Sequence, residues 1–168
     1  MNRTTKAIVR GMIISLFICI FATVNTYANE YEGLAGLDTI KAVFDVRAGK
    51  VKSAALQLDL VYKTFKDKNI REATADTDFV VVIAGPATKL VTTNTQGFSA
   101  EEKVELEQIA KNIEAMAADG IRIEICMFAA KYFGVDPATI LPAIKQVENG
   151  WISLIGYQAK GYSLVAIY

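Results

Sequence analysis

A continuous apolar run from Phe79 to Ala84, rich in valine and closed by Gly85-Pro86, limits most strongly what this chain can fold into. A strand with one solvated face alternates apolar and polar residues, whereas this run contains no polar position. Such a run is typical of a central strand in a parallel sheet, where helices cover both faces. It therefore predicts an α/β architecture.

The segments on either side of this run alternate between the patterns of strands and helices. Ser99 and Glu102 form a capping box before an unbroken apolar stripe, and Gly120 is placed to end that helix. Strand patterns cover residues 39–46, 121–125, 144–147 and 163–167, and helix patterns cover residues 51–66, 99–120, 127–133 and 151–160. We therefore predict a three-layer α/β/α, flavodoxin-like domain with a mostly parallel five-stranded sheet.

The first 28 residues have the pattern of a cleavable signal peptide. Three basic residues precede an apolar run at 12–24, and the small residues Thr26 and Ala28 occupy the positions that a signal peptidase reads. A membrane anchor fits this segment less well, because spanning a bilayer takes about 20 apolar residues. We predict cleavage after Ala28 and a periplasmic or secreted protein with no stable membrane anchor.

Cleavage would leave a flexible N-terminal arm at residues 29–38 and one domain at residues 39–168. The mature chain has 15 basic and 18 acidic residues, which gives a formal charge of −3. It contains no basic tract, so we expect no nucleic-acid partner.

The mature chain lacks residue types that several classes of functional site require, so these classes are excluded. The chain has no histidine, which excludes Ser/His/Asp and Cys/His catalytic arrangements. Cys126 is its only cysteine, which is too few for zinc, copper or haem ligation or for a thioredoxin-like dithiol. No glycine-rich nucleotide-binding pattern follows a predicted strand. We therefore predict neither a metal nor a cofactor.

Two further features have a simple structural interpretation. Gly85-Pro86 lies at the sheet edge where open α/β folds bind ligands, and its amides could hold an anion. A plain turn is the interpretation that we favour there. Asp76 and Asp78 are expected to lie in a solvated loop.

Cys126 is the residue at which chemistry is most credible. It follows a predicted strand and precedes a predicted helix, so free amides and the helix dipole would favour the nucleophilic thiolate, and Lys131 would add positive charge. The opposite interpretation is that Ile125, Met127 and Phe128 bury the thiol as part of an apolar core. The local sequence leaves both interpretations open.

Four segments resemble those of a known family. Three of them give the best match: residues 118–126 and 126–135, which surround the cysteine, and residues 147–150 with 158–162, in the closing helix and strand. Residues 82–90, at the end of the valine-rich run, give a fourth and weaker match. With these segments in their order and spacing, the chain from Lys41 to Tyr168 resembles the DsrE/DsrF-like family.

This resemblance implies a flavodoxin-like fold, assembly into homotrimers or hexamers, and in some members sulfur transfer through a cysteine persulfide. Only Cys126 matches a catalytic position of the family. The first hypothesis is an exported sulfurtransferase or sulfur carrier that exchanges sulfane sulfur with a donor or acceptor protein. The alternative is a non-catalytic oligomeric binding module, with a structural cysteine and a small ligand at the sheet edge near Gly85.

Overall fold

The computed structural model describes residues 31–168. The predicted signal peptide and the first two residues of the predicted arm lie outside the described residues. The strands are β1 (Thr39–Val46), β2 (Asp76–Ile83), β3 (Arg122–Cys126), β4 (Lys145–Val147) and β5 (Ser163–Ile167). The α-helices are α2 (Val51–Lys66), α3 (Lys68–Ala73), α4 (Ala100–Ala118), α5 (Met127–Tyr132) and α6 (Gly150–Ala159). Three short 3₁₀ helices complete the described part: η1 (Glu32–Leu34), η2 (Gly85–Leu90) and η3 (Pro137–Thr139).

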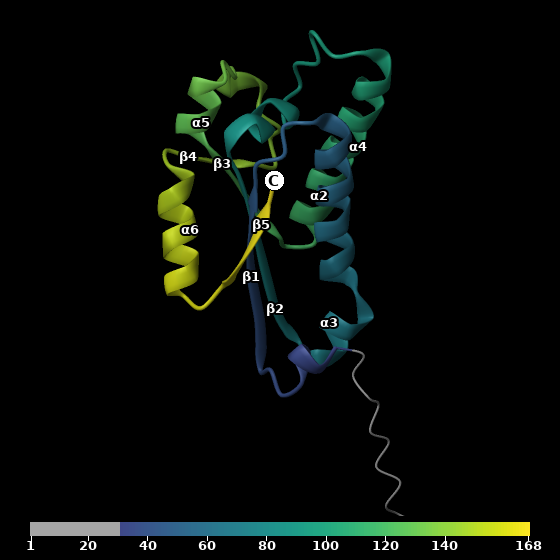
Figure 1. The fold of residues 1–168 in the computed structure, drawn as a ribbon, viewed down its shortest axis with the longest axis vertical. Coiled ribbons are helices and arrows are strands. Elements are labelled where there is room, and N and C mark those ends of the chain that lie inside the picture. Colours follow the sequence, from purple (N-terminus) through teal and green to yellow (C-terminus); the bar gives the residue numbers. More distant parts are fainter. Residues whose placement is uncertain (1–30) are drawn as a thin grey trace, which may run out of the picture. The chain divides into compact units, whose positions relative to one another are not determined.

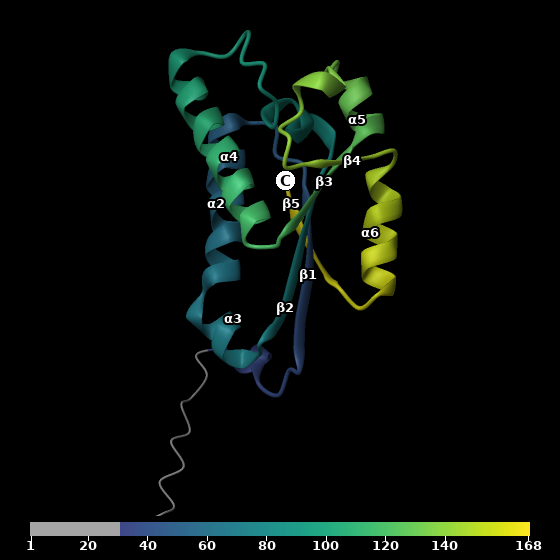
Figure 2. The ribbon, with the colours of Figure 1, turned by 180° about the vertical axis from the view of Figure 1, so that it is seen from behind.

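The five strands form one sheet in the order β4-β3-β2-β1-β5, and every neighbouring pair is parallel. Helices α2, α3 and α4 lie on one side of this sheet, and α5 and α6 lie on the other (Figures 1 and 2). The predicted three-layer α/β/α fold is confirmed. As predicted, the valine-rich run lies in the central strand β2, where Val80, Val81, Val82 and Ile83 are fully buried.

The face covered by α2 and α4 holds the main hydrophobic core. Alternate residues of β1, β2 and β3 point to it, and α4 contributes Ile109, Ile113 and Met116, each fully buried. Ser99 accepts a hydrogen bond from the amide of Glu102 at 3.2 Å, and the Glu102 carboxylate accepts one from the Ser99 amide at 2.9 Å. The predicted capping box therefore fixes the start of this helix.

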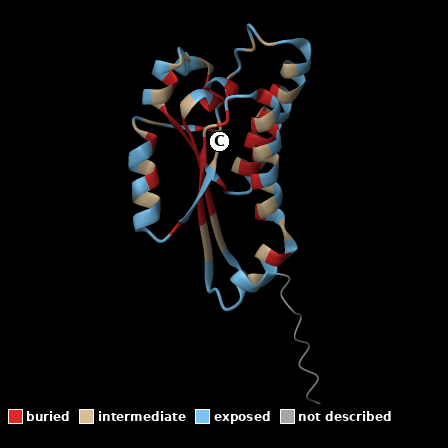
Figure 3. Cartoon of the chain, viewed as in Figure 1, coloured by how far each residue is buried: buried red, intermediate tan, exposed pale blue. Residues whose placement is uncertain are grey.

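The opposite face is thinner and more polar. Its apolar cluster consists of five buried residues: Val43, Val80, Val82, Leu154 and Tyr162. Helix α6 contacts β1, β2 and β3 from this side. In Figure 3 the buried residues are concentrated in the centre of the sheet and on the inner sides of the helices, while the outer side of α6 is exposed. This face therefore contributes less apolar burial than the face beneath α4.

Three of the differences between the structure and the sequence prediction bear on the elements around the sheet. Strand β2 begins at Asp76, so the Asp76/Asp78 pair lies in a strand and not in a loop. Helix α3 was not predicted, because its six residues are too few to show a period, although the Asp67 side chain caps it by accepting a hydrogen bond from the Asn69 amide. The 3₁₀ helix η2 was also missed. It begins at Gly85, whose φ of +56° favours glycine.

None of the helices within residues 31–168 is both long and apolar enough to span a membrane.

Candidate functional site

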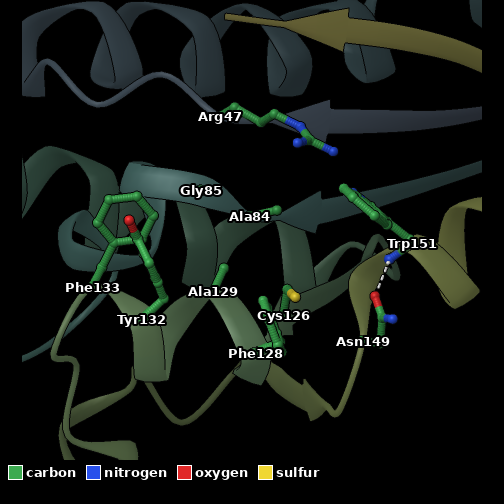
Figure 4. Close-up of a pocket in the computed structure, with 10 residues that line it drawn as sticks. All are labelled: Arg47, Ala84, Gly85, Cys126, Phe128, Ala129, Tyr132, Phe133, Asn149 and Trp151. Carbon is green, nitrogen blue, oxygen red and sulfur yellow. Dashed lines mark hydrogen bonds between the residues drawn. The ribbon is translucent and has the colours of Figure 1, made fainter.

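A pocket of about 360 Å³ lies where β1, β2 and β3 end. Its lining residues come from the segments that follow these strands, from α5 and from the start of α6: Arg47, Ala84, Gly85, Cys126, Phe128, Ala129, Tyr132, Phe133, Asn149 and Trp151. Figure 4 shows these side chains around the cavity. The carboxyl end of a parallel sheet is where open α/β folds bind ligands.

Cys126 is the last residue of β3 and lies in the wall of this pocket. The residue is only 5% exposed, and it is one of the residues that line the pocket. The Cys126 side chain makes no capping hydrogen bond to α5, and the Phe128 amide already donates to the Glu148 carbonyl at 3.0 Å. Lys131 is exposed and does not line the pocket. The sequence suggested that Ile125 and Phe128 could bury the thiol. Ile125 is buried, whereas Phe128 is 75% exposed.

The start of α6 lies unusually close to Cys126. A Cβ atom added to Gly150 would lie 2.9 Å from the Cys126 Cβ, 3.2 Å from Val82 Cγ1 and 3.6 Å from the Cys126 sulfur. Contacts between carbon atoms are normally about 3.5–4.0 Å long. Only glycine fits here without a shift of the helix, so Gly150 sets how closely α6 approaches the cysteine.

Arg47 is the one positively charged residue in the lining of this pocket. Its Nε donates to both carboxylate oxygens of Asp45, at 3.0 and 2.9 Å. The Asp45 side chain is 7% exposed and that of Arg47 is 30% exposed. The ion pair therefore holds Arg47 through Nε, while its two Nη groups have no hydrogen-bond partner among the described residues. Sequence reasoning missed this pair, although the spacing of two places both side chains on one face of a strand.

Exposed aromatic side chains surround the mouth of the pocket. Phe128 is 75% exposed, Tyr132 79% and Trp151 62%. Large aromatic side chains are enriched where proteins bind other molecules, so this combination of exposure and position is typical of a binding site. The Asn149 side chain accepts a hydrogen bond from the Trp151 amide at 3.0 Å, which caps α6 beside the pocket.

Beneath α6, a polar network crosses the thin face of the sheet. Arg122 donates to Asp78 at 2.7 Å and to the Tyr162 hydroxyl at 2.6 Å, and that hydroxyl donates to Asp78 at 2.5 Å. Asp78 is therefore not a solvated loop residue, and the expectation for it was wrong. Burial raises the pKa of Tyr162, and its hydrogen bond to Asp78 raises that pKa further.

Glu124 is a buried carboxylate on the same face of β3 as Cys126. It is 5% exposed, and one of its oxygens accepts a hydrogen bond from the Tyr157 hydroxyl at 3.0 Å. The other oxygen has no hydrogen-bond partner among the residues that the structure describes. Burial raises the pKa of Tyr157 to about 12, and its hydrogen bond to Glu124 contributes to this increase. Tyr157 therefore stays protonated and can act as the donor at neutral pH.

Gly85, the first residue of η2, and Cys126 line the same pocket, so the two positions that the sequence singled out separately share one cavity. Within residues 31–168, no group of three or more histidine, cysteine or acidic residues is arranged to hold a metal ion.

The solved structures that are similar to this chain in fold include the following two. A protein of unknown function, MTH1491 from Methanobacterium thermoautotrophicum, matches with a TM-score of 0.58 at 13% identity, over 76% of this chain and 98% of that one. The ychN protein of E. coli matches with a TM-score of 0.56 at 11% identity, over 76% of this chain and 99% of that one. At these identities the matches establish the fold alone.

Sequence comparison gives two further matches. An uncharacterized protein of Aquifex aeolicus (strain VF5) is 27% identical over 127 residues, which are 75% of this chain and 55% of that protein. The chain thus spans about half the length of that curated relative. The family model for the DsrE/DsrF-like family matches residues 41–167, which include Cys126 and most of the described fold. The chain therefore belongs to the DsrE/DsrF-like family.

Proposed function

We propose that this chain carries sulfane sulfur on Cys126, as a sulfur carrier or sulfurtransferase that works through a persulfide. Membership of the DsrE/DsrF-like family suggests a function related to sulfur relay. The single observation that carries the finer proposal is the position of Cys126, at the end of β3 in the wall of a pocket of about 360 Å³. The signal-peptide pattern supports action in the periplasm or outside the cell.

The proposed reaction is a thiol exchange. The Cys126 thiolate attacks the outer sulfur of a donor persulfide, R–S–S⁻, because the thiolate and not the thiol is the nucleophile. A bond forms between the Cys126 sulfur and the transferred sulfur as the sulfur–sulfur bond of the donor breaks. The electron pair of that bond leaves on R–S⁻, and Cys126 is left as a persulfide anion. An acceptor thiolate removes the sulfur by the same step.

The test is sulfur uptake by the folded protein. After treatment with polysulfide, we expect intact-mass analysis to show the mass of added sulfur on the wild-type chain and none on Cys126→Ser, because the serine hydroxyl does not take part in thiol exchange. Iodoacetamide should also alkylate native Cys126 through the pocket. The proposal fails if native Cys126 resists both reagents and reacts only after unfolding.

That failure would support a second function, a non-catalytic binding module with a structural cysteine. The low exposure of Cys126 favours this alternative, and Gly85 lies in the same pocket, where a small ligand would bind. Unreactive Cys126 together with ligand binding at the pocket would identify it.

We also propose that the chain assembles with copies of itself, as proteins of its family are known to do. Within residues 31–168, strand β5 lies at the edge of the sheet and pairs only with β1. Its Leu164 and Val165 are exposed, as are Ile152 and Ile155 on α6. An open edge strand beside exposed apolar side chains is a surface that a second chain can cover.

For this assembly we expect light scattering at micromolar concentration to report a trimer or hexamer. Replacing Ile155, which is 67% exposed, with lysine should shift the mass towards the monomer without changing the fold seen by circular dichroism. Lys63→Ala on α2, which changes an exposed charged residue, is the control and should leave the mass unchanged. A wild-type monomer would contradict the proposal.

A further inference from the structure

The Cys126 pocket combines an apolar wall with a single cationic group. Phe128, Tyr132, Phe133 and Trp151 provide most of the wall, whereas Arg47 provides the charge. Figure 4 shows the Arg47 side chain extending toward Trp151, with the Cys126 sulfur in the wall of the same cavity. A ligand that fills the space must therefore be mainly apolar and must offer an acceptor at one end.

Arg47 is prepared to bind that acceptor. Its Nε is bonded to Asp45, so the guanidinium is held in place, and its Nη groups have no partner within residues 31–168. An arginine fixed in this way presents parallel donors that match a carboxylate or sulfonate group. The Asn149 side-chain oxygen is occupied by the Trp151 amide, which leaves the amide nitrogen of Asn149 as a second donor in the lining.

The volume agrees with a ligand larger than an inorganic anion. Sites for small organic molecules range from about 300 to 1,000 Å³, and this pocket of about 360 Å³ is at the small end of that range. An inorganic anion such as sulfate would contact Arg47 and leave the aromatic wall uncovered. An organic anion with a ring or short hydrocarbon body would cover the wall and pair with Arg47 together.

We propose that the pocket selects small organic anions, with the apolar body against the aromatic wall, the anionic group on Arg47 and the reactive atom at Cys126. This inference rests on the proposed function, since it names the class of sulfur donor that the same pocket takes: organic thiosulfonates, R–SO₂–S⁻. The Cys126 thiolate attacks the outer sulfur and forms the new sulfur–sulfur bond. The bond from that sulfur to the sulfonyl sulfur breaks, its electron pair leaves with the sulfinate R–SO₂⁻, and Cys126 becomes a persulfide anion.

Binding is tested first, without sulfur chemistry, on the Cys126→Ser chain. Trp151 is the only tryptophan in the sequence, so its fluorescence reports on this pocket, and calorimetry gives the dissociation constant. We expect benzenesulfonate to bind at least tenfold more tightly than inorganic sulfate, which lacks the ring, and than neutral benzenesulfonamide, which lacks the charge. Equal binding of sulfate, equal binding of the sulfonamide, or no binding of benzenesulfonate would each overturn the inference.

Two variants separate the contributions. Arg47→Gln should weaken benzenesulfonate binding about tenfold or more and leave benzenesulfonamide unchanged. Since Arg47 pairs with buried Asp45, this variant is first checked by circular dichroism. Phe128→Ala, at a side chain that is 75% exposed, keeps the charge and should weaken both ring ligands together. If Phe128→Ala changes neither affinity, the aromatic wall does not bind the ring and the inference is wrong.

Sulfur transfer to the wild-type chain then distinguishes this inference from the proposed function. We expect benzenethiosulfonate to load Cys126 at least tenfold faster than thiosulfate at equal concentration. Loading from polysulfide without this preference would overturn the inference and leave the proposed function standing. Selective binding of benzenesulfonate by Cys126→Ser, with no loading of the wild type from any donor, would overturn the proposed function and the assignment of thiosulfonates as donors, and would leave the pocket as a binding site for small organic anions.

Discussion

Replacing Ile113 with alanine is expected to lower the unfolding free energy by about 2–5 kcal/mol, the range for removing a large aliphatic side chain from a packed core. Ile113 lies on α4, is fully buried and packs in the cluster between α2, α4 and the sheet. The deletion leaves a cavity that the neighbouring strands cannot fill, because a parallel sheet paired on both sides of β2 has little freedom to move.

Urea unfolding followed by circular dichroism measures this loss. Val104→Ala is the matched control, since Val104 lies on the same helix and is 66% exposed. Its effect should stay within about 0.5 kcal/mol. At urea concentrations below its unfolding transition, the Ile113→Ala chain is folded and should still take up sulfur at Cys126. The reason is that the pocket lies at the strand ends and Ile113 does not line it. A loss under about 1 kcal/mol would contradict the packing described for this face.

Replacing Gly150 with alanine is expected to destabilise the chain, even though alanine is the better helix former. The added methyl group would lie 2.9 Å from the Cys126 Cβ and 3.2 Å from Val82 Cγ1, so the first turn of α6 has to move away from β3. Overpacking of this kind costs about 1–3 kcal/mol. The higher helix propensity of alanine offsets at most about 1 kcal/mol of that cost.

Gly156 provides the control for this prediction on the same helix. A Cβ atom added to Gly156 meets no other atom within 4 Å, so Gly156→Ala should be neutral or stabilise the chain by up to about 1 kcal/mol. The difference between the two glycine variants in urea unfolding therefore isolates the close approach to Cys126. Equal stability of the two variants would show that α6 adapts to the methyl group without strain.

The parts of the fold that could be predicted are those with a local signal. The run at 79–84 predicted the central strand because burial on both faces removes every polar position, and the Ser99 capping box predicted the start of α4. The short helix α3 and the 3₁₀ helix η2 escaped prediction because six residues show no reliable period. Helix α5 is equally short and was predicted, because Gly134 marks its end. The sequence likewise predicted that Cys126 ends a strand, but not whether a pocket would reach it.

The remaining features of the site depend on residues that are distant in the chain. Asp78 and Arg122 are separated by 44 positions, and only the pairing of β2 with β3 brings them together. The contact of Gly150 with Cys126 depends in the same way on how α6 lies across the sheet. The Asp45–Arg47 pair does not depend on distant residues, although it was missed. Asp45 lies in β1 and Arg47 follows directly after it, and residues two positions apart along a strand have their side chains on the same face.

The absence of a second cysteine beside Cys126 within residues 31–168 has a consequence for the kinetics of the proposed sulfur transfer. Cys126 is the only cysteine within residues 31–168, and the one other cysteine of the sequence, Cys19, belongs to the predicted signal peptide. A sulfur atom held on Cys126 therefore has no thiol within the same folded domain to which it can pass. Under the proposed function, its release to the thiol of a separate acceptor molecule is second order, and the lifetime of the loaded form would be set by the concentration of an acceptor that can enter the pocket.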